Sequence, residues 1–87
     1  MTKYLIKTTY DATEKNETHY GKENAHQEYY LSKGGRSSNQ IDWYVLEKAY
    51  TRLCDAERVL KTQLEWAKRE METGYWIRKE EIIEVEC

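Results

Sequence analysis

The chain contains no proline and no phenylalanine, and only four glycines among its 87 residues. No apolar run approaches the roughly 18 residues of a membrane-spanning helix, and the first residues lack the apolar stretch of a signal peptide. We therefore expect no membrane association and a cytoplasmic location.

Cysteine is scarce as well. The two cysteines, Cys54 and the terminal Cys87, are typical of reduced thiols rather than of a disulfide framework. Cys54 is expected to be buried as a small apolar side chain.

Neither sign of charge dominates the sequence. Lys and Arg number 14 against 16 Asp and Glu, which gives a formal net charge of −2. Residues 1–40 hold six basic and five acidic residues, whereas residues 41–87 hold eight and eleven. Because a dedicated nucleic-acid-binding domain is usually net basic, the composition disfavours that class of function.

Tyrosine and tryptophan are abundant, with eight and three residues respectively. Both combine an apolar ring with a polar tip and are enriched at binding interfaces. A single domain over residues 1–87 has a thin core and little room for an enclosed active site. These features predict a protein that binds a partner.

Two strands are predicted in the first half of the chain. Residues 3–10 alternate, which places Tyr4, Ile6, Thr8 and Tyr10 on one face and Lys3, Leu5, Lys7 and Thr9 on the other. The hydrophilic stretch 11–24 is expected to form a long hairpin connection or an exposed loop. A second strand is predicted near 26–32, and the paired glycines of Lys33-Gly34-Gly35-Arg36 predict a tight turn after it.

The segment 41–50 has two interpretations. Trp43, Tyr44 and Val45 favour a strand over 42–49, whereas apolar residues spaced by three and four favour one unbroken helix over 42–73. Such a helix would be about 48 Å long, which is long for so small a domain. We expect the strand, followed by a helix with Thr51 as its N-cap.

A helix over 52–73 and a closing strand over 75–86 complete the expected elements. The helix has a predicted buried stripe of Leu53, Ala56, Leu60, Leu64, Ala67 and Met71, and Gly74 stands where a left-handed residue would end it. In the strand, Lys79-Glu80-Glu81 interrupts the apolar alternation, which predicts a bulge or a bend near residues 79–81. The predicted fold is therefore α+β: three or four largely antiparallel strands packed on one main helix, in the order β-β-β-α-β, or β-β-α-β if the helix is unbroken.

Three features could bind a partner. Exposed amides at the Lys33–Ser38 turn, with Lys33 and Arg36 beside them, could hold a phosphate. Strand aromatic residues that point away from the helix could stack on a base or contact a protein; these are Tyr29, Tyr30, Tyr44, Tyr75 and Trp76. Glu80, Glu81 and Glu84 could present a negative surface to a basic partner. Plainer interpretations are a solvated turn, tyrosines in a wet core, and an edge strand protected by charge.

Enzyme signatures are absent from the sequence. No Gly-rich phosphate motif or Cys-x-x-Cys pair occurs, and we expect His19 and His26 to be two exposed side chains rather than metal ligands. No acid, base and nucleophile converge. We therefore expect no catalysis, no cofactor and no metal ion.

In overall style the chain resembles small accessory proteins of phages and other mobile elements, among them the anti-CRISPR inhibitors. The resemblance is carried by Thr2-Lys3-Tyr4-Leu5-Ile6, the Lys33-Gly34-Gly35 turn, the helix opening Thr51-x-x-x-x-Ala56-x-x-x-Leu60, and Tyr75-Trp76-Ile77. It implies a non-enzymatic inhibitor that occupies a surface of a bacterial defence protein, such as a CRISPR-Cas nuclease complex, in the host cytoplasm.

The expected function is thus a protein-interaction module with a protein partner, and a homodimer is a further expectation. The alternative is a nucleotide- or nucleic-acid-binding domain that uses the Lys33–Ser38 turn and the exposed aromatic residues.

Overall fold

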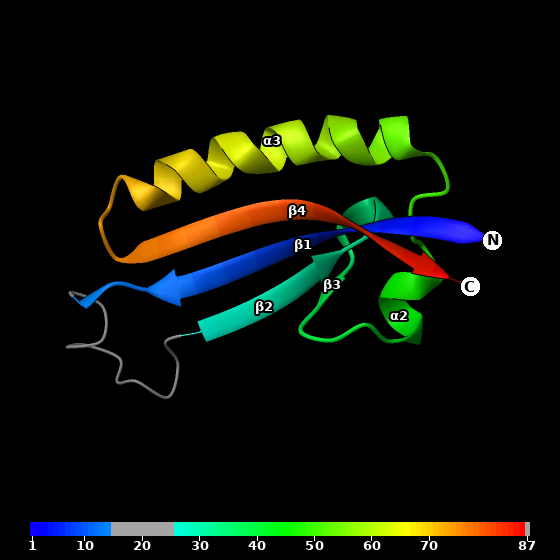
Figure 1. Cartoon of the computed structure of the whole chain (residues 1–87), viewed down its shortest axis with the longest axis horizontal. Helices are drawn as coiled ribbons and strands as arrows, with labels where there is room; N and C mark the ends of the chain where they lie inside the picture. The colour runs from blue at the N-terminus through cyan, green and yellow to red at the C-terminus, as the bar shows by residue number, and fades with distance from the viewer. Residues whose placement is uncertain (15–25, 87) are drawn as a thin grey trace.

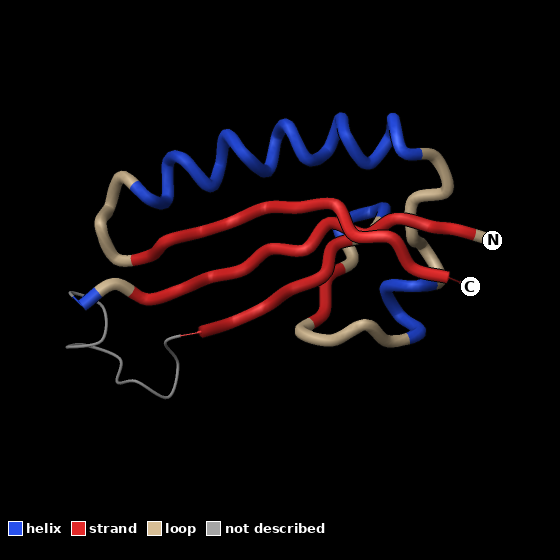
Figure 2. Tube along the Cα trace, viewed as in Figure 1, coloured by secondary structure: helices blue, strands red, loops and turns tan. Residues whose placement is uncertain are grey.

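The computed structural model describes residues 1–14 and 26–86, and within them the chain has the α+β fold expected. Four strands form one antiparallel sheet in the spatial order β3-β2-β1-β4. They are β1 (Thr2–Ala12), β2 (His26–Leu31), β3 (Ser37–Ser38) and β4 (Trp76–Glu86). One long helix, α3 (Leu53–Met71), runs along the β4 side of the sheet (Figures 1 and 2).

The expected connection over residues 11–24 lies mostly outside the described residues. At its start the prediction is wrong, because β1 continues through Ala12 and pairs there with Trp76.

Strand β1 lies between β2 and β4, and its alternating side chains enter two separate small cores. Ile6 packs with Ala56 of α3 on one face of the sheet. Leu5 packs with Val45 and Ala49 on the other face. Both Leu5 and Ile6 have 0% of their surface exposed. The sheet is therefore covered on both faces at the end where the two chain termini lie (Figure 1).

The cover on the second face comes from a short helix, α2 (Trp43–Leu46), so the predicted strand over 42–49 is wrong. The Asp42 carboxylate accepts a hydrogen bond of 3.2 Å from the Val45 N–H and caps the helix. Val45 and Ala49, four residues apart, are both buried. Capping and burial together outweigh the strand propensity of the aromatic residues.

The unbroken helix over 42–73 is also wrong, because α2 ends at Leu46 and α3 begins at Leu53. Tyr50 lies between them and forms an isolated antiparallel bridge with Tyr4 of β1. The third strand of the β-β-β-α-β order is therefore Ser37–Ser38, which pairs with the end of β2.

Glycine marks two chain reversals, as predicted. Gly34 and Gly35 have φ angles of 71° and 74° in the short 3-10 turn after β2, and Gly74 has a φ of 79° after α3. Residues that carry a side chain rarely adopt this left-handed backbone conformation, whereas glycine adopts it readily.

Helix α3 has Arg52 at its N-cap position, rather than Thr51, and no side-chain cap hydrogen bond. Only part of the predicted stripe faces the sheet. Ala56 and Ala67 are buried, and Leu60 packs against the core. Leu53, Leu64 and Met71 remain 44%, 49% and 41% exposed. They lie on one flank of the helix, whereas Gln63 and Glu70 face inward toward Arg78.

Strand β4 has no bulge, so this one of the two predicted alternatives near residues 79–81 is wrong. Its register with β1 is continuous from Thr2 opposite Glu86 to Ala12 opposite Trp76. The charged run over 79–81 stays in the strand because Glu80, which points to the helix side, forms an ion pair with Arg78. None of the helices over the described residues combines the length and apolar composition needed to cross a bilayer.

The second core generates a stability prediction. Val45→Ala should lower the free energy of unfolding by roughly 1–3 kcal/mol, because it removes two buried methyl groups from the α2 contact. The neighbouring Trp43→Ala, at a side chain that is 74% exposed, should change it by less than about 0.5 kcal/mol. Urea unfolding of both variants provides the measurement, and equal effects would contradict the assignment of α2.

Candidate functional site

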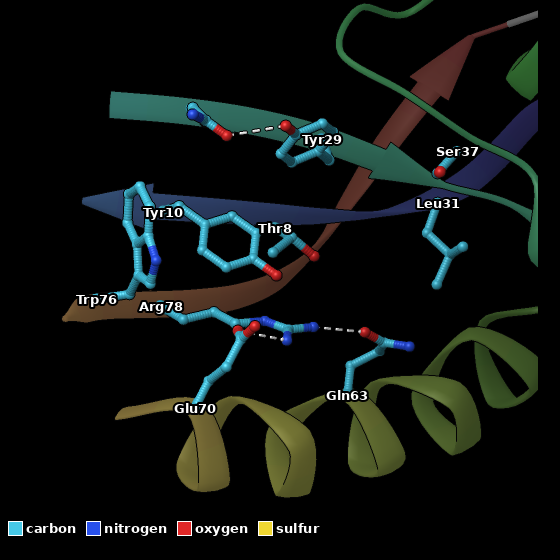
Figure 3. Close-up of a pocket in the computed structure, with 10 residues that line it drawn as sticks. Thr8, Tyr10, Tyr29, Leu31, Ser37, Gln63, Glu70, Trp76 and Arg78 are labelled. Carbon is cyan, nitrogen blue, oxygen red and sulfur yellow. Dashed lines mark hydrogen bonds and ion pairs between the residues drawn. The ribbon is translucent and has the colours of Figure 1, made fainter. Parts of the chain in front are cut away.

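The side chain of Arg78 organises the space between α3 and the sheet. It extends from β4 toward the helix, where Glu70 and Gln63 meet its guanidinium (Figure 3), and Glu80 of the same strand is its third partner. Nε donates to Glu80 at 2.6 Å, Nη1 to Glu70 at 2.9 Å, and Nη2 to Gln63 at 2.8 Å. Glu80 also accepts a hydrogen bond from the Thr8 hydroxyl.

Burial and the neighbouring carboxylates shift the pKa of Arg78 in opposite directions. The Arg78 side chain is 8% exposed and that of Glu80 is 0% exposed. Desolvation by burial lowers the pKa of Arg78, but the hydrogen bonds to Glu70 and Glu80 outweigh it, so the pKa is raised and the guanidinium stays charged. Two carboxylates therefore neutralise the cation inside the molecule.

Three aromatic side chains adjoin this polar cluster. The Tyr10 ring meets Tyr29 edge to face at a centroid distance of 5.9 Å and Trp76 at 5.7 Å. The Arg78 guanidinium lies over the Tyr10 ring at 5.2 Å. Burial raises the pKa of the Tyr10 hydroxyl, so this group is neutral at pH 7. Edge-to-face packing of this kind holds the rings in defined positions.

The aromatic side chains line an open groove of about 440 Å³. Its floor is the part of the sheet that α3 leaves uncovered, and one wall is the helix itself (Figure 3). The lining residues are Thr8, Tyr10, Gln27, Tyr29, Leu31, Ser37, Gln63, Glu70, Trp76 and Arg78. A second hollow of about 310 Å³ shares Glu70 and Arg78 with it and reaches Trp66, so the concave surface continues along the helix.

Of the predicted aromatic site residues, the structure brings two together here. They lie on the same face of the sheet as α3, and not on the face away from the helix as predicted. Tyr29, 37% exposed, and Trp76 both line the groove. Tyr30 points to the opposite face of the sheet and packs against the core beneath α2. Tyr75 is half-buried and immediately precedes β4, and it is not among the residues that line the groove.

The predicted phosphate site at Lys33–Ser38 is not assembled. Arg36 forms an ion pair with Glu47 at 2.9 Å and donates to the Tyr44 carbonyl oxygen. Its guanidinium also lies 4.8 Å from the centre of the Tyr44 ring. Lys33 is exposed in the turn, so Arg36 is directed toward α2 rather than toward a ligand shared with Lys33. Tyr44 therefore belongs to a separate exposed patch with Trp43.

The predicted acidic surface of β4 is divided by the alternation of the strand. Glu80 is internal, because its carboxylate is used by Arg78 and Thr8, so it cannot be part of an exposed row. Glu81 and Glu84 are exposed, but their opposite parity places them on different faces of the sheet.

Sequence reasoning missed Tyr10, Arg78, Gln63 and Glu70 as site residues. Period-two alternation does place Tyr10, Trp76 and Arg78 on the helix side of the sheet. Nothing in the sequence indicates that a buried Arg78 needs Gln63 and Glu70, which therefore turn inward in place of Leu64 and Met71.

The remaining candidates lie apart from the groove. Cys54 is exposed rather than buried, because the first turn of α3 turns it to solvent beside Arg52. His19 is outside the described residues. His26 is exposed, and its two ring nitrogens meet Asp11 at 2.6 Å and Glu28 at 3.3 Å. Among residues 1–14 and 26–86, no group of His, Cys, Asp and Glu side chains is arranged to hold a metal ion.

Comparison with known proteins gives no match among family models, curated proteins or solved structures.

The buried ion pair generates the second prediction. Arg78→Ala should cost about 3–5 kcal/mol of folding free energy, because it leaves the Glu80 carboxylate buried without a cation. Arg78→Met combined with Glu80→Met removes both charges and should recover most of that loss. Urea unfolding of the two variants decides the point. A loss below about 1 kcal/mol for Arg78→Ala would mean that the pair is solvated.

The third prediction concerns pH. Hydrogen bonds to Asp11 and Glu28 raise the pKa of His26 above its ordinary 6.5, so protonated His26 stabilises the fold. That contribution is complete below pH 6.5 and is lost as the pH rises through the raised value. NMR titration of the imidazole should give a midpoint above 6.5 that Asp11→Asn lowers. A midpoint unchanged by Asp11→Asn would show that the pair does not form in solution.

Proposed function

We propose that this protein is a non-catalytic protein-interaction module whose aromatic groove receives side chains of a partner protein. The observation that carries the proposal is the set Tyr10, Tyr29 and Trp76, packed edge to face along an open groove. Large rigid aromatic groups lose little conformational entropy on binding and dominate the energy of protein interfaces.

The charges around the groove support a protein ligand over a nucleic acid. Among the described residues, Arg78 is the one cation that lines it, and Glu70 and Glu80 already neutralise that cation. Binding to a nucleic-acid backbone needs cationic side chains that are free to replace the counterions of its phosphates. Arg36, which the nucleotide- or nucleic-acid-binding alternative requires, forms an ion pair with Glu47. The nucleotide- or nucleic-acid-binding alternative therefore has less support.

Inhibition of a bacterial defence protein, such as a CRISPR-Cas nuclease complex, is the specific form of the proposal. It rests on the resemblance to phage accessory proteins and requires a binding surface without catalysis. A groove of this size would anchor two or three side chains of the target, and the contacts around it would exclude water.

Selection from a random peptide display library tests the groove. Enriched peptides should bind the purified protein, and Tyr29→Ala should weaken that binding by about fivefold or more. Trp43→Ala is the matched control, because it removes an exposed aromatic ring from α2 and should leave the affinity unchanged. Peptides whose binding responds to Trp43 and not to Tyr29 would move the site to α2.

An oligonucleotide control separates the two classes of function. Single- and double-stranded oligonucleotides should show no binding at about 150 mM salt. Salt-sensitive retention that Lys33→Ala with Arg36→Ala abolishes would instead support the nucleic-acid alternative.

A further inference from the structure

Strand β4 lies at the edge of the sheet, and over the described part of the chain its outer side pairs with no strand. It is eleven residues long, and its continuous pairing with β1 shows that it is regular. Sheet edges that avoid further pairing are usually short, bulged, covered or lined by charged side chains. This edge is neither short nor bulged, and its exposed charges, Lys79, Glu81 and Glu84, oppose pairing only with a strand of like charge.

Two contacts of β1 show which residues of β4 point their backbone N–H and C=O groups away from β1. Tyr4 exchanges two hydrogen bonds with Tyr50, of 2.7 and 2.9 Å, on the side away from β4. The Thr13 N–H donates to the Tyr75 carbonyl oxygen on the β4 side. Because this direction alternates along an antiparallel pair, odd-numbered residues of β4 bond to β1. Even-numbered residues, among them Glu80, Ile82 and Glu84, point their N–H and C=O groups outward.

An apolar flank of α3 lies beside this edge. Leu64 and Met71 are 49% and 41% exposed, and with Lys79 and Glu81 of β4 they line a hollow of about 670 Å³. A strand added to β4 would place alternate side chains against this flank. Its other side chains would lie beside Lys79 and Glu81 on the opposite face.

The net charge of the edge indicates the charge of the strand that it can bind. Arg78 neutralises Glu80, which leaves the exposed Glu81 and Glu84 against Lys79. Lys7, which lies opposite Glu81 in β1, is paired with Glu28. An incoming strand with basic side chains therefore complements the edge.

A second copy of β4 complements the edge poorly. Antiparallel pairing centred on Glu81 or Glu84 places that exposed glutamate opposite itself. Pairing centred on Glu80 places Lys79 opposite Glu81, but it brings together two buried Glu80 carboxylates that Arg78 already pairs. Like charges directly opposite each other destabilise a strand pair.

We propose that the outer edge of β4 binds an extended segment of a partner protein as a fifth strand, with apolar side chains toward Leu64 and Met71 and basic side chains beside Glu81. The aromatic groove lies on the other flank of α3, where Trp66 projects. Apart from Arg78, which lines both hollows, the two sites use different residues, and this one does not depend on the proposed function.

Amide hydrogen exchange tests the proposal, with a capped nine-residue peptide of alternating valine and lysine as the probe. In the free protein the outward amides of Glu80, Ile82 and Glu84 should exchange rapidly at every protein concentration, whereas those of Glu81 and Ile83 are protected. The peptide should slow the outward amides selectively. No selective protection at millimolar peptide would overturn the proposal.

Matched variants locate the contact. Glu81→Lys should weaken peptide binding about two- to fivefold, and Lys79→Glu should strengthen it by a similar factor, because the two side chains share one face. Leu64→Ala should also weaken binding, and Trp66→Ala, on the other flank of α3, should not. Equal effects of Leu64→Ala and Trp66→Ala, or Glu81→Lys and Lys79→Glu shifting affinity in the same direction, would contradict the assigned edge. Protection of the outward amides that grows with protein concentration would identify a second copy as the occupant instead.

Discussion

The structure depends on the neutralisation of one buried guanidinium. Arg78 projects from an edge strand into the space beneath α3, where an unpaired cation would be strongly destabilising. Its two carboxylate partners come from different elements, since Glu80 lies in the same strand and Glu70 lies in the helix. The ion pairs therefore determine which side of α3 turns toward the sheet.

The orientation of α3 accounts for both exposed surfaces. With Gln63 and Glu70 facing Arg78, the apolar side chains of Leu64 and Met71 turn outward beside β4. The helix packs mainly on β4, so the side chains of β1 and β2 farther from it remain uncovered (Figure 3). Tyrosine and tryptophan suit these partly solvated positions, because their polar tips remain hydrated while the rings pack. A thin core thus leaves aromatic surface on one side of α3 and aliphatic surface on the other.

The sequence pattern was sufficient for the long elements. Alternation predicted β1 and β4, periodicity predicted α3, and the paired glycines Gly34 and Gly35 predicted the turn. Local pattern failed at residues 42–49, where strand propensity competes with a cap at Asp42 and with burial of Val45 against a strand about 40 residues away. These contacts are invisible to any short window of sequence.

The candidate site was predicted less well than the fold. Tyr29 and Trp76 were identified because their residue types suit interfaces, but alternation alone could not show how much of the sheet face beneath it α3 leaves uncovered. Arg78 was missed since arginine is rarely buried unless it is paired. Its partner Glu70 lies eight residues away in another element. Arg36 and Glu80 were predicted to contact a partner through their charges, but each forms an ion pair within the protein.

The central claim is that Arg78 is held inside the protein between Glu80, Glu70 and the Tyr10 ring. NMR observation of the Arg78 side-chain Nε–H at neutral pH tests it most directly. The account predicts a resolved resonance that exchanges slowly with water, is shifted by the Tyr10 ring, and shows nuclear Overhauser contacts to Tyr10. An Nε–H that exchanges as fast as that of a solvent-exposed arginine, without contacts to Tyr10, would contradict the account.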